Sequence, residues 1–363
     1  MTRLLWVLPL LLTACAPSME RVAVSEDGRG FVLGDTEEAF VPWGVNYDHD
    51  RSGRLIEEYW DDEWETVAED FREMKALGAN VVRVHLQFGS FMKSATEPDG
   101  ERLSRLMRLC EMAERTGLRL NITGLGCYHR KDVPAWYDAM DESARWAAQE
   151  KFWEAVATAC SRSPAVFCYD LMNEPVVPGE QGIQPGWLGP EFGGKCFVQF
   201  VTRETAGRTR PQVAEAWIAR LAGVVRRCDP GRLVTVGLVD WSLDRPNALT
   251  SGFPPDRVAA GLDFLSVHIY PVQGKVGEAI RTLEGFSVGK PVVIEETFPL
   301  RCGPEEFEEF LQRSRATACG WISFYWGATE AECRADGTIP GAMMAGWIAR
   351  FRRGIENRAP EKP

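Results

Sequence analysis

The sequence lacks several features that would point directly to a function. Outside its first 14 residues it has no long uncharged apolar run, so no permanent membrane span is expected. Its 41 Lys and Arg are outnumbered by 52 Asp and Glu, which argues against a nucleic-acid partner because phosphate binding needs clustered cations. It has only 4 His and no Cys-x-x-Cys or His-x-His spacing, so neither a metal site nor a cofactor is expected. No internal repeat, low-complexity tract or linker marks a second domain.

The first 14 residues have the features of an export signal. A positive charge at Arg3 is followed by an apolar run over residues 4–12, which is too short for a permanent membrane span. The run leads into LTAC, which resembles the lipobox of bacterial lipoproteins, in which the cysteine is lipidated. We therefore expect an exported chain that is anchored by lipid on Cys15 to a bacterial membrane, on its periplasmic or cell-surface side. An ordinary cleaved signal peptide is the alternative.

Eight short apolar runs recur along the chain. They lie at residues 40–47, 81–86, 119–126, 166–174, 233–239, 264–270, 291–297 and 320–327. Each is nearly continuous in Val, Ile, Leu and Phe, which is typical of strands buried on both faces. The longer segments between them have helical period, as in the stripe of apolar residues from Trp60 to Leu77.

Buried strands that alternate with helices predict an α/β fold, a (β/α)8 TIM barrel, as one domain over residues 40–357. A tether with a possible short hairpin precedes it at residues 15–39, and a polar tail follows at residues 358–363. Such barrels typically have about 250 residues, and much of the excess here is the Gly- and Pro-rich segment 176–210. This enlarged loop follows the fourth strand and should lie at the face where barrel enzymes keep their active sites.

Polar and aromatic side chains gather at the expected C-terminal ends of these strands. They are Trp43, Asn46, Arg83, His85, His129, Asn173, Glu174, Asp240, Trp241, His268, Tyr270, Glu295, Glu296 and Trp326. In a closed barrel these ends converge on one mouth. Carboxylates of the fourth and seventh strands would then face each other, and cleavage of a glycosidic bond needs such a pair.

Several motifs, in this order, carry a resemblance to glycoside hydrolase family 5. They are NVVRVHL at residues 80–86, LMNEP at 171–175, HIY at 268–270, KPVVIEET at 290–297 and FYWG at 324–327. The resemblance covers residues 40–347 and implies a retaining enzyme with its catalytic glutamates on the fourth and seventh strands. It implies that Glu174 is the general acid/base and that Asn173 orients the 2-hydroxyl of the sugar.

The same resemblance implies roles for four further residues. Arg83 and Tyr270 would hold the nucleophile. His268 and Trp326 would line the sugar subsite next to the cleaved bond.

The nucleophile itself is ambiguous, because Glu295 and Glu296 are adjacent on the seventh strand. Strand alternation puts Ile294 and Glu296 on one face and Glu295 on the other. The family spacing P-x-x-x-x-E, counted from Pro291, also selects Glu296. We therefore expect Glu296 to face the sugar, and Glu295 to turn toward the helix layer or a neighbouring loop.

Other strand-end residues have two readings each. His129 is either a subsite residue or a hydrogen-bonding residue of its loop. Trp43 and Trp241 are either sugar platforms or packing residues at the top of the barrel. His85 is expected to support its neighbours rather than to catalyse.

The sequence therefore predicts an exported retaining β-glycoside hydrolase, cellulase-like or β-mannanase-like, that acts on a β-linked poly- or oligosaccharide. An exo-acting glycosidase or a glycolipid hydrolase is an alternative, in which the long loop after the fourth strand closes one end of the cleft. A different class of protein, a carbohydrate-binding lipoprotein without catalysis, remains the third possibility.

Overall fold

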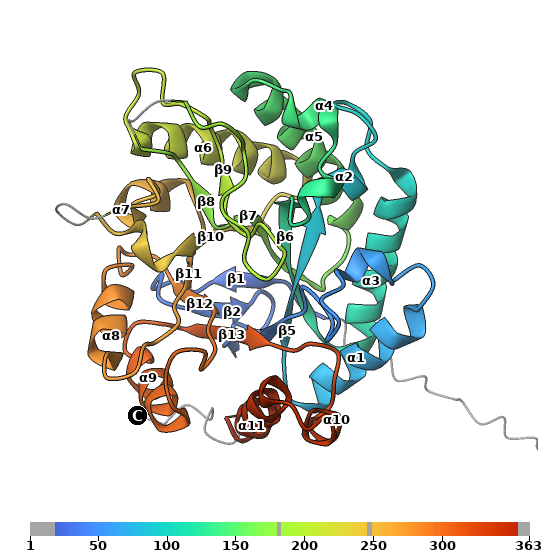
Figure 1. The fold of residues 1–363 in the computed structure, drawn as a ribbon, viewed down its shortest axis with the longest axis vertical. Helices are drawn as coiled ribbons and strands as arrows, with labels where there is room; N and C mark the ends of the chain where they lie inside the picture. The colour runs from blue at the N-terminus through green and yellow to red at the C-terminus, as the bar shows by residue number, and fades with distance from the viewer. Residues whose placement is uncertain (1–18, 180–182, 245–248, 355–363) are drawn as a thin grey trace, which may run out of the picture.

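The computed structural model describes residues 19–179, 183–244 and 249–354, and its centre is a closed barrel of eight parallel strands (Figure 1). In barrel order these are β4 (Trp43–Asn46), β5 (Val81–Gln87), β6 (Arg119–Gly126), β7 (Val166–Asn173), β10 (Leu233–Val239), β11 (Leu265–His268), β12 (Val292–Glu296) and β13 (Gly320–Phe324). β13 pairs with β4 and closes the ring. The predicted (β/α)8 barrel is confirmed.

Helices surround the barrel (Figure 1). The longer ones are α1 (Trp64–Ala76), α3 (Gly100–Thr116), α5 (Glu142–Cys160), α6 (Arg210–Cys228), α8 (Val276–Glu284), α9 (Pro304–Ser314) and α11 (Ile339–Arg353). Shorter pieces are α2 (Phe88–Phe91), α4 (Ala135–Asp138), α7 (Pro255–Val258) and α10 (Glu330–Ala335), with 3-10 turns η1 (Ile56–Glu58), η2 (Arg130–Asp132), η3 (Asp240–Ser242) and η4 (Ala259–Gly261). Within the described residues, none of these helices combines the length and apolarity that a bilayer crossing requires.

Local sequence explains where the helices begin and end. Asp99 caps α3 by accepting hydrogen bonds from the N–H groups of Glu101 and Arg102, and Gly117 ends the helix with φ 71°. α6 begins at a Thr209 cap, with Pro211 in its first turn. These signals fix the lengths of the helices and so place the strand ends between them.

A small antiparallel sheet covers the N-terminal end of the barrel. It consists of β1 (Val22–Val24), β2 (Phe31–Leu33) and β3 (Ala39–Phe40), and a turn with Gly28 at φ 69° joins the first two. Phe31 packs edge-on against Phe167 and Phe264, with ring centroids 5.3 and 5.2 Å away. Because this end is filled with apolar side chains, the C-terminal mouth is the end available to a polar ligand.

The loop after β7 forms the most irregular part of the mouth. β8 (Pro175–Val176) and β9 (Gln199–Phe200) pair in parallel at its base. We call residues 186–200 the strap; in Figure 1 the yellow-green segment between β7 and α6 passes over the barrel near β6. The predicted enlarged loop is therefore folded against the mouth.

Candidate active site

Glu174 directly follows β7 and has an uncommon backbone conformation. Its φ is 47°, in the left-handed region that residues other than glycine rarely adopt. Its N–H donates a hydrogen bond of 2.9 Å to the carbonyl of Gly237 on β10. The turn directs the side chain to the mouth, where Oε1 lies 3.0 Å from Nδ1 of His268. A strained residue held by a neighbouring strand is typical of functional sites.

Glu296 is the last residue of β12 and receives two strong hydrogen bonds. Nη1 of Arg83 donates to Oε1 at 2.6 Å, and the hydroxyl of Tyr270 donates to Oε2 at 2.7 Å. Both contacts fix the orientation of the carboxyl group. The side chain is 12% exposed, so a ligand at the mouth can still reach it.

The carboxyl groups of Glu174 and Glu296 lie close together, with His268 between them. One oxygen of each carboxyl group and a ring nitrogen of His268 all lie within 4.8 Å of one another. Nδ1 of His268 is 3.4 Å from Oε2 of Glu296. Burial acts against the charged ring, but Glu296, Glu174 and Glu295 outweigh it and raise the pKa of His268 to about 10. A cationic His268 therefore lies between the two carboxyl groups.

Arg83 lies below this pair, at the centre of a buried polar layer. Its Nη2 donates to Oδ2 of Asp170 at 2.7 Å, and its Nε donates to Thr123 at 2.8 Å. Burial opposes its charge, yet the carboxylates of Glu295, Asp170 and Glu296 raise the pKa of Arg83 well above its usual value. A fully buried arginine that contacts several carboxylates is a rigid support for Glu296.

Glu295 belongs to the same layer, which corrects the expectation that it turns away from the barrel interior. It is fully buried, accepts a hydrogen bond of 2.5 Å from Asn121, and lies 3.6 Å from Nη2 of Arg83. The β11–β12 register shifts so that His268 pairs with Glu296 where alternation would pair it with Glu295. Such a bulge re-aims side chains, and it lets adjacent glutamates both face inward. The face assignment from alternation was therefore wrong, although Glu296 is the one at the mouth.

Asn173, the last residue of β7, is held from two sides. Its Oδ1 accepts a hydrogen bond of 3.0 Å from Arg83, and its Nδ2 donates to the carbonyl of Phe197 in the strap at 3.1 Å. The side chain that the family resemblance assigns to the sugar 2-hydroxyl is thus fixed beside Glu174. It also couples the strap to the polar layer.

The strap forms a wall along the β5–β6 side of the mouth. The N–H of Cys196 donates to the carbonyl of Tyr128, and Phe197 packs edge-on against the Tyr128 ring at 5.1 Å. A Cβ placed on Gly53, in the loop after β4, would lie 3.3 Å from Nζ of Lys195. The strap therefore extends from the end of β7 to the loop after β4.

Two aromatic residues of the loop after β7 differ in their exposure to solvent. Trp187 is buried and donates its indole N–H to the carbonyl of Asp138 at 3.1 Å, so it anchors the loop. Phe192 is 78% exposed.

Trp326 follows β13 and forms part of the opposite rim. His49, from the loop after β4, stacks on it with ring centroids 5.6 Å apart and an interplanar angle of 16°. Phe298 packs against the same indole at 5.6 Å. An aromatic surface of this kind can support the apolar face of a sugar ring.

Two tryptophans were expected near the mouth, and the structure separates them. Trp43 begins β4 instead of ending it, and it packs on Phe351 of α11 with ring centroids 4.9 Å apart. The reading of Trp43 as a sugar platform or as packing at the top of the barrel is corrected: it packs at the N-terminal end of the strand. Trp241 is half-buried in η3.

His129 and His85 lie on the β5–β6 side. His129 is 3.6 Å from Glu58 and lines a separate cavity of about 230 Å³ with Glu57 and Gln87. His85 is buried, with Nδ1 2.5 Å from the Tyr128 hydroxyl and Nε2 3.3 Å from Asn46. Burial and the charge of Arg83 lower the pKa of His85 well below its usual value. His85 therefore supports its neighbours, as expected.

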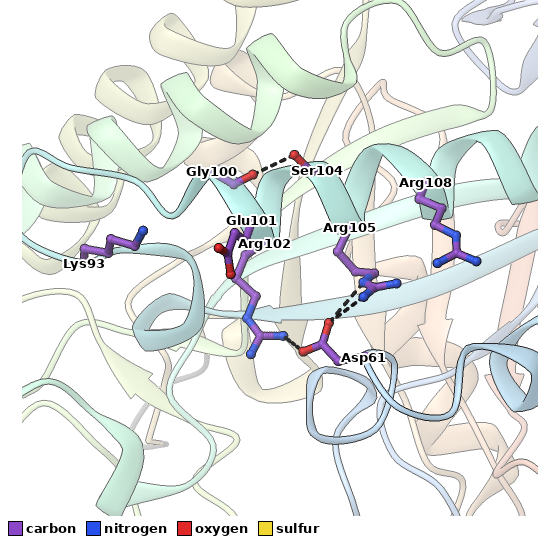
Figure 2. Close-up of a pocket in the computed structure, with 8 residues that line it drawn as sticks. All are labelled: Asp61, Lys93, Gly100, Glu101, Arg102, Ser104, Arg105 and Arg108. Atoms are coloured by element: carbon purple, nitrogen blue, oxygen red, sulfur yellow. Dashed lines mark hydrogen bonds and ion pairs between the residues drawn. The ribbon is translucent and has the colours of Figure 1, made fainter.

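Another groove lies on the outside of the barrel, between α3 and the turn before α1 (Figure 2). Its arginines have partners: Arg102 and Arg105 pair with Asp61 at 2.6 and 3.0 Å, and Arg108 lies over the Trp64 ring at 4.1 Å. Glu174, Glu296 and His268 lie together at the barrel mouth, so the mouth is the candidate active site.

Sequence reasoning missed Asp170, Gly237 and Asp48. Asp170 lies inside an apolar run, and its carboxylate accepts hydrogen bonds from Arg83, Thr123 and the N–H of Gly237. A Cβ on Gly237 would lie 2.9–3.1 Å from charged or polar atoms of Arg83, His268 and Glu295, so only glycine fits there. The presence of an Asp within an apolar run could have indicated Asp170. No feature of the sequence singled out Gly237 or Asp48.

Two close glutamates above a buried arginine, at the mouth of a (β/α)8 barrel, define a glycoside hydrolase site of the two-carboxylate type. The chain belongs to glycoside hydrolase family 5, since the family model described as Cellulase (glycosyl hydrolase family 5) matches residues 45–323. The resemblance stated from the motifs is thereby confirmed. Comparison with curated protein sequences gives no match.

Solved structures share this fold at low sequence identity. An exo-β-1,4-mannosidase from Opitutaceae bacterium strain TAV5 has a TM-score of 0.66 and 18% identity over 93% of this chain, which spans 63% of that protein. A GH5_18 protein from Streptomyces cattleya, in complex with Manβ1-4GlcNAc, has a TM-score of 0.64 and 18% identity, covering 89% and 82% of the two chains. A β-1,4-mannanase from the sea hare Aplysia kurodai has a TM-score of 0.61 and 17% identity, covering 93% and 96%.

Proposed function

We propose that this glycoside hydrolase cleaves β-linked glycosides with retention of anomeric configuration, with Glu296 as nucleophile and Glu174 as general acid/base. The observation that carries the proposal is the short separation of the two carboxyl groups, which have oxygens within 4.8 Å of each other. Retaining enzymes have carboxyl groups about 5–5.5 Å apart, whereas inverting ones need roughly 6.5–9.5 Å to admit a water.

The reaction takes place in two displacements. First, a carboxylate oxygen of Glu296 bonds to the anomeric carbon, the glycosidic C–O bond breaks, and Glu174 gives its proton to the leaving oxygen. Then water attacks the anomeric carbon, its proton passes to Glu174, and the ester bond to Glu296 breaks. Arg83 and Tyr270 hold Glu296 in place through the bonds of 2.6 and 2.7 Å.

The polar layer supports these steps electrostatically. The cationic His268 contacts both carboxyl groups, at 3.0 Å from Glu174 and 3.4 Å from Glu296. These contacts orient both carboxyl groups toward the mouth. This assembled pair favours catalysis over the alternative of a carbohydrate-binding lipoprotein without activity.

The test is hydrolysis of a panel of aryl β-glycosides, with the configuration of the first product followed by NMR. The proposal expects a β-configured hemiacetal before mutarotation. An α-configured first product would contradict the double displacement, and a chain inactive on the whole panel would contradict the function.

A narrower proposal is exo action on short β-mannosides. The strap wall supports it, because the hydrogen bond of Asn173 to Phe197 and the position of the Lys195 side chain next to Gly53 enclose one side of the mouth. Two of the solved neighbours, an exo-β-1,4-mannosidase and a β-1,4-mannanase, suggest the sugar. Exo action predicts release of one monosaccharide from a β-1,4-mannan without an early fall in viscosity. A rapid fall in viscosity would indicate a cellulase-like or mannanase-like endo enzyme.

Export and lipid anchoring at Cys15 also remain proposals. They rest on the charge at Arg3, the short apolar run and the lipobox-like LTAC, all of which lie outside the described residues. A lipid anchor would hold the catalytic barrel at a bacterial membrane, where its carbohydrate substrate would be met outside the cytoplasm.

A further inference from the structure

Asp48 is a buried carboxylate at the mouth that lacks the partners such groups usually have. It lies two residues beyond the end of β4, and its side chain is 7% exposed. Its Oδ1 has no hydrogen-bond partner among the described residues. Its Oδ2 is 4.0 Å from Nε2 of His49, which is too long for a hydrogen bond.

Two other buried carboxylates of the barrel each accept at least one hydrogen bond, although Oε2 of Glu295 accepts none. Asp170 accepts hydrogen bonds from Arg83, Thr123 and Gly237. Glu295 accepts one from Asn121 and contacts Arg83. A buried acceptor without a donor destabilises the fold, so a structural role does not account for Asp48.

The surroundings of Asp48 place it beside the reacting sugar. Burial and the charge of Glu296 raise its pKa, whereas His49 and Arg83 act in the opposite direction. Its neighbour His49 stacks on Trp326 at the rim of the mouth, and its other neighbour, Tyr47, donates its N–H to the carbonyl of Arg83, so the backbone holds Asp48 at the mouth beside the polar layer. Asn173, which the resemblance assigns to the 2-hydroxyl, lies on β7 at a different part of the ring of strands.

We propose that Asp48 determines specificity by accepting hydrogen bonds from the vicinal 3- and 4-hydroxyls of the sugar ring that Glu296 attacks. The proposal rests on the proposed function, because the position of Glu296 places the anomeric carbon. The two oxygens of a carboxylate match the two donors of a vicinal diol. The ligand is a neutral hexopyranoside, since Asp48 and Glu296 together disfavour an acidic sugar.

A consequence is that the ring in this subsite is a chain end. If the 4-hydroxyl donates to a buried carboxylate, it carries no further sugar. Asp48 thus supplies a reason for exo action that is independent of the strap.

The experiment uses the aryl β-glycoside that the full chain hydrolyses best, together with its 3-deoxy and 4-deoxy analogues. A hydrogen bond to a charged group contributes enough that the wild-type enzyme should lose about 10- to 100-fold in kcat/KM on each analogue. Asp48→Ala removes the acceptor of both hydroxyls, so it should lose the product of the two factors on the parent glycoside and, on each analogue, the factor of the hydroxyl that remains. The ratio of parent to analogue should therefore fall to about 1 in Asp48→Ala.

Stability separates this role from a structural one. Removing an unpartnered buried charge should leave or raise the melting temperature of Asp48→Asn, whereas a structural residue would lower it. Asp61→Asn is the matched control, because it makes the same change in the remote groove of Figure 2. It should change neither the parent-to-analogue ratio of kcat/KM nor the melting temperature. An unchanged parent-to-analogue ratio in active Asp48 variants would overturn the inference alone. Absence of wild-type activity on every glycoside would overturn the proposed function, and this inference with it.

Discussion

Glu295→Gln should cost the protein stability while leaving measurable turnover. Glu295 is fully buried, lies 3.6 Å from Arg83 and 3.5 Å from His268, and accepts a hydrogen bond from Asn121. A glutamine can still accept from Asn121, but its amide nitrogen would then face two cations. Glu296 keeps its own bonds to Arg83 and Tyr270, so the proposed nucleophile remains in place.

The expected loss of unfolding free energy follows from the removal of one charged partner in a buried cluster, which typically costs about 3–5 kcal/mol. Arg83 retains Asp170 and Glu296 as partners, so the lower figure of about 3 kcal/mol applies. With an unfolding entropy of about 2.1 cal/mol/K per residue over 363 residues, this corresponds to a fall in Tm of roughly 4 °C.

The dependence on pH provides a second signature. Burial acts against the charge of Glu295, but Arg83, His268 and Asn121 outweigh it and lower its pKa below the usual 4.5. A lowered carboxylate pKa contributes stability that is present above the unfolded value and lost as pH falls through the folded value. The difference in stability between wild type and Glu295→Gln should therefore be full above pH 4.5 and shrink in more acidic solution.

Calorimetry or thermal circular dichroism, paired with an aryl glycoside assay, measures both effects. Glu101→Gln, a carboxylate at the exposed start of α3, is the control and should leave Tm unchanged. A Tm for Glu295→Gln within about 1 °C of wild type would refute the reasoning that pairing of opposite charges stabilises the buried polar layer around Arg83. Complete loss of turnover with normal stability would instead assign the nucleophile role to Glu295.

Three further predictions test other parts of the account. Gly237→Ala should abolish activity and lower Tm, because its Cβ would lie 2.9 Å from Nη2 of Arg83 and 3.0 Å from Nε2 of His268; normal activity would contradict the close packing. His268, with its pKa raised to about 10 among Glu174, Glu296, Glu295 and Arg83, should contribute stability below pH 6.5 that is lost as pH rises through about 10. The difference in urea unfolding between wild type and His268→Gln measures this loss, and a difference that grows with pH would refute it. Cys15→Ala should release the protein from membranes on cell fractionation, since lipid chains supply the anchor; continued membrane association would contradict lipidation.

Much of the fold could be predicted because burial on both faces gives each barrel strand a continuous apolar run. Each of the eight predicted runs overlaps a barrel strand. The first run began too early, since Phe40 pairs within β3 in the sheet that covers the barrel bottom. Trp43 was misplaced for a related reason: it begins a four-residue strand whose C-terminal end is Asn46.

Site residues could be predicted from the sequence where they lie at strand ends. They could not be predicted where a backbone irregularity determines which way a side chain points. Glu174, Arg83 and Tyr270 converge as the barrel requires. The bulge between β11 and β12 leaves no mark in an apolar strand, so strict alternation placed Glu295 on the wrong side. Asp48 lies beyond the strand end, where sequence alone does not show burial or missing partners.

The most direct test of the central claim is covalent trapping of the glycosyl-enzyme. An activated 2-fluoro glycoside slows the second displacement, and peptide mapping identifies the labelled carboxylate. The account predicts one sugar per chain, attached to Glu296 and absent in Glu296→Ala. A label on Glu295, or steady turnover with an inverted product and no trapped ester, would contradict it.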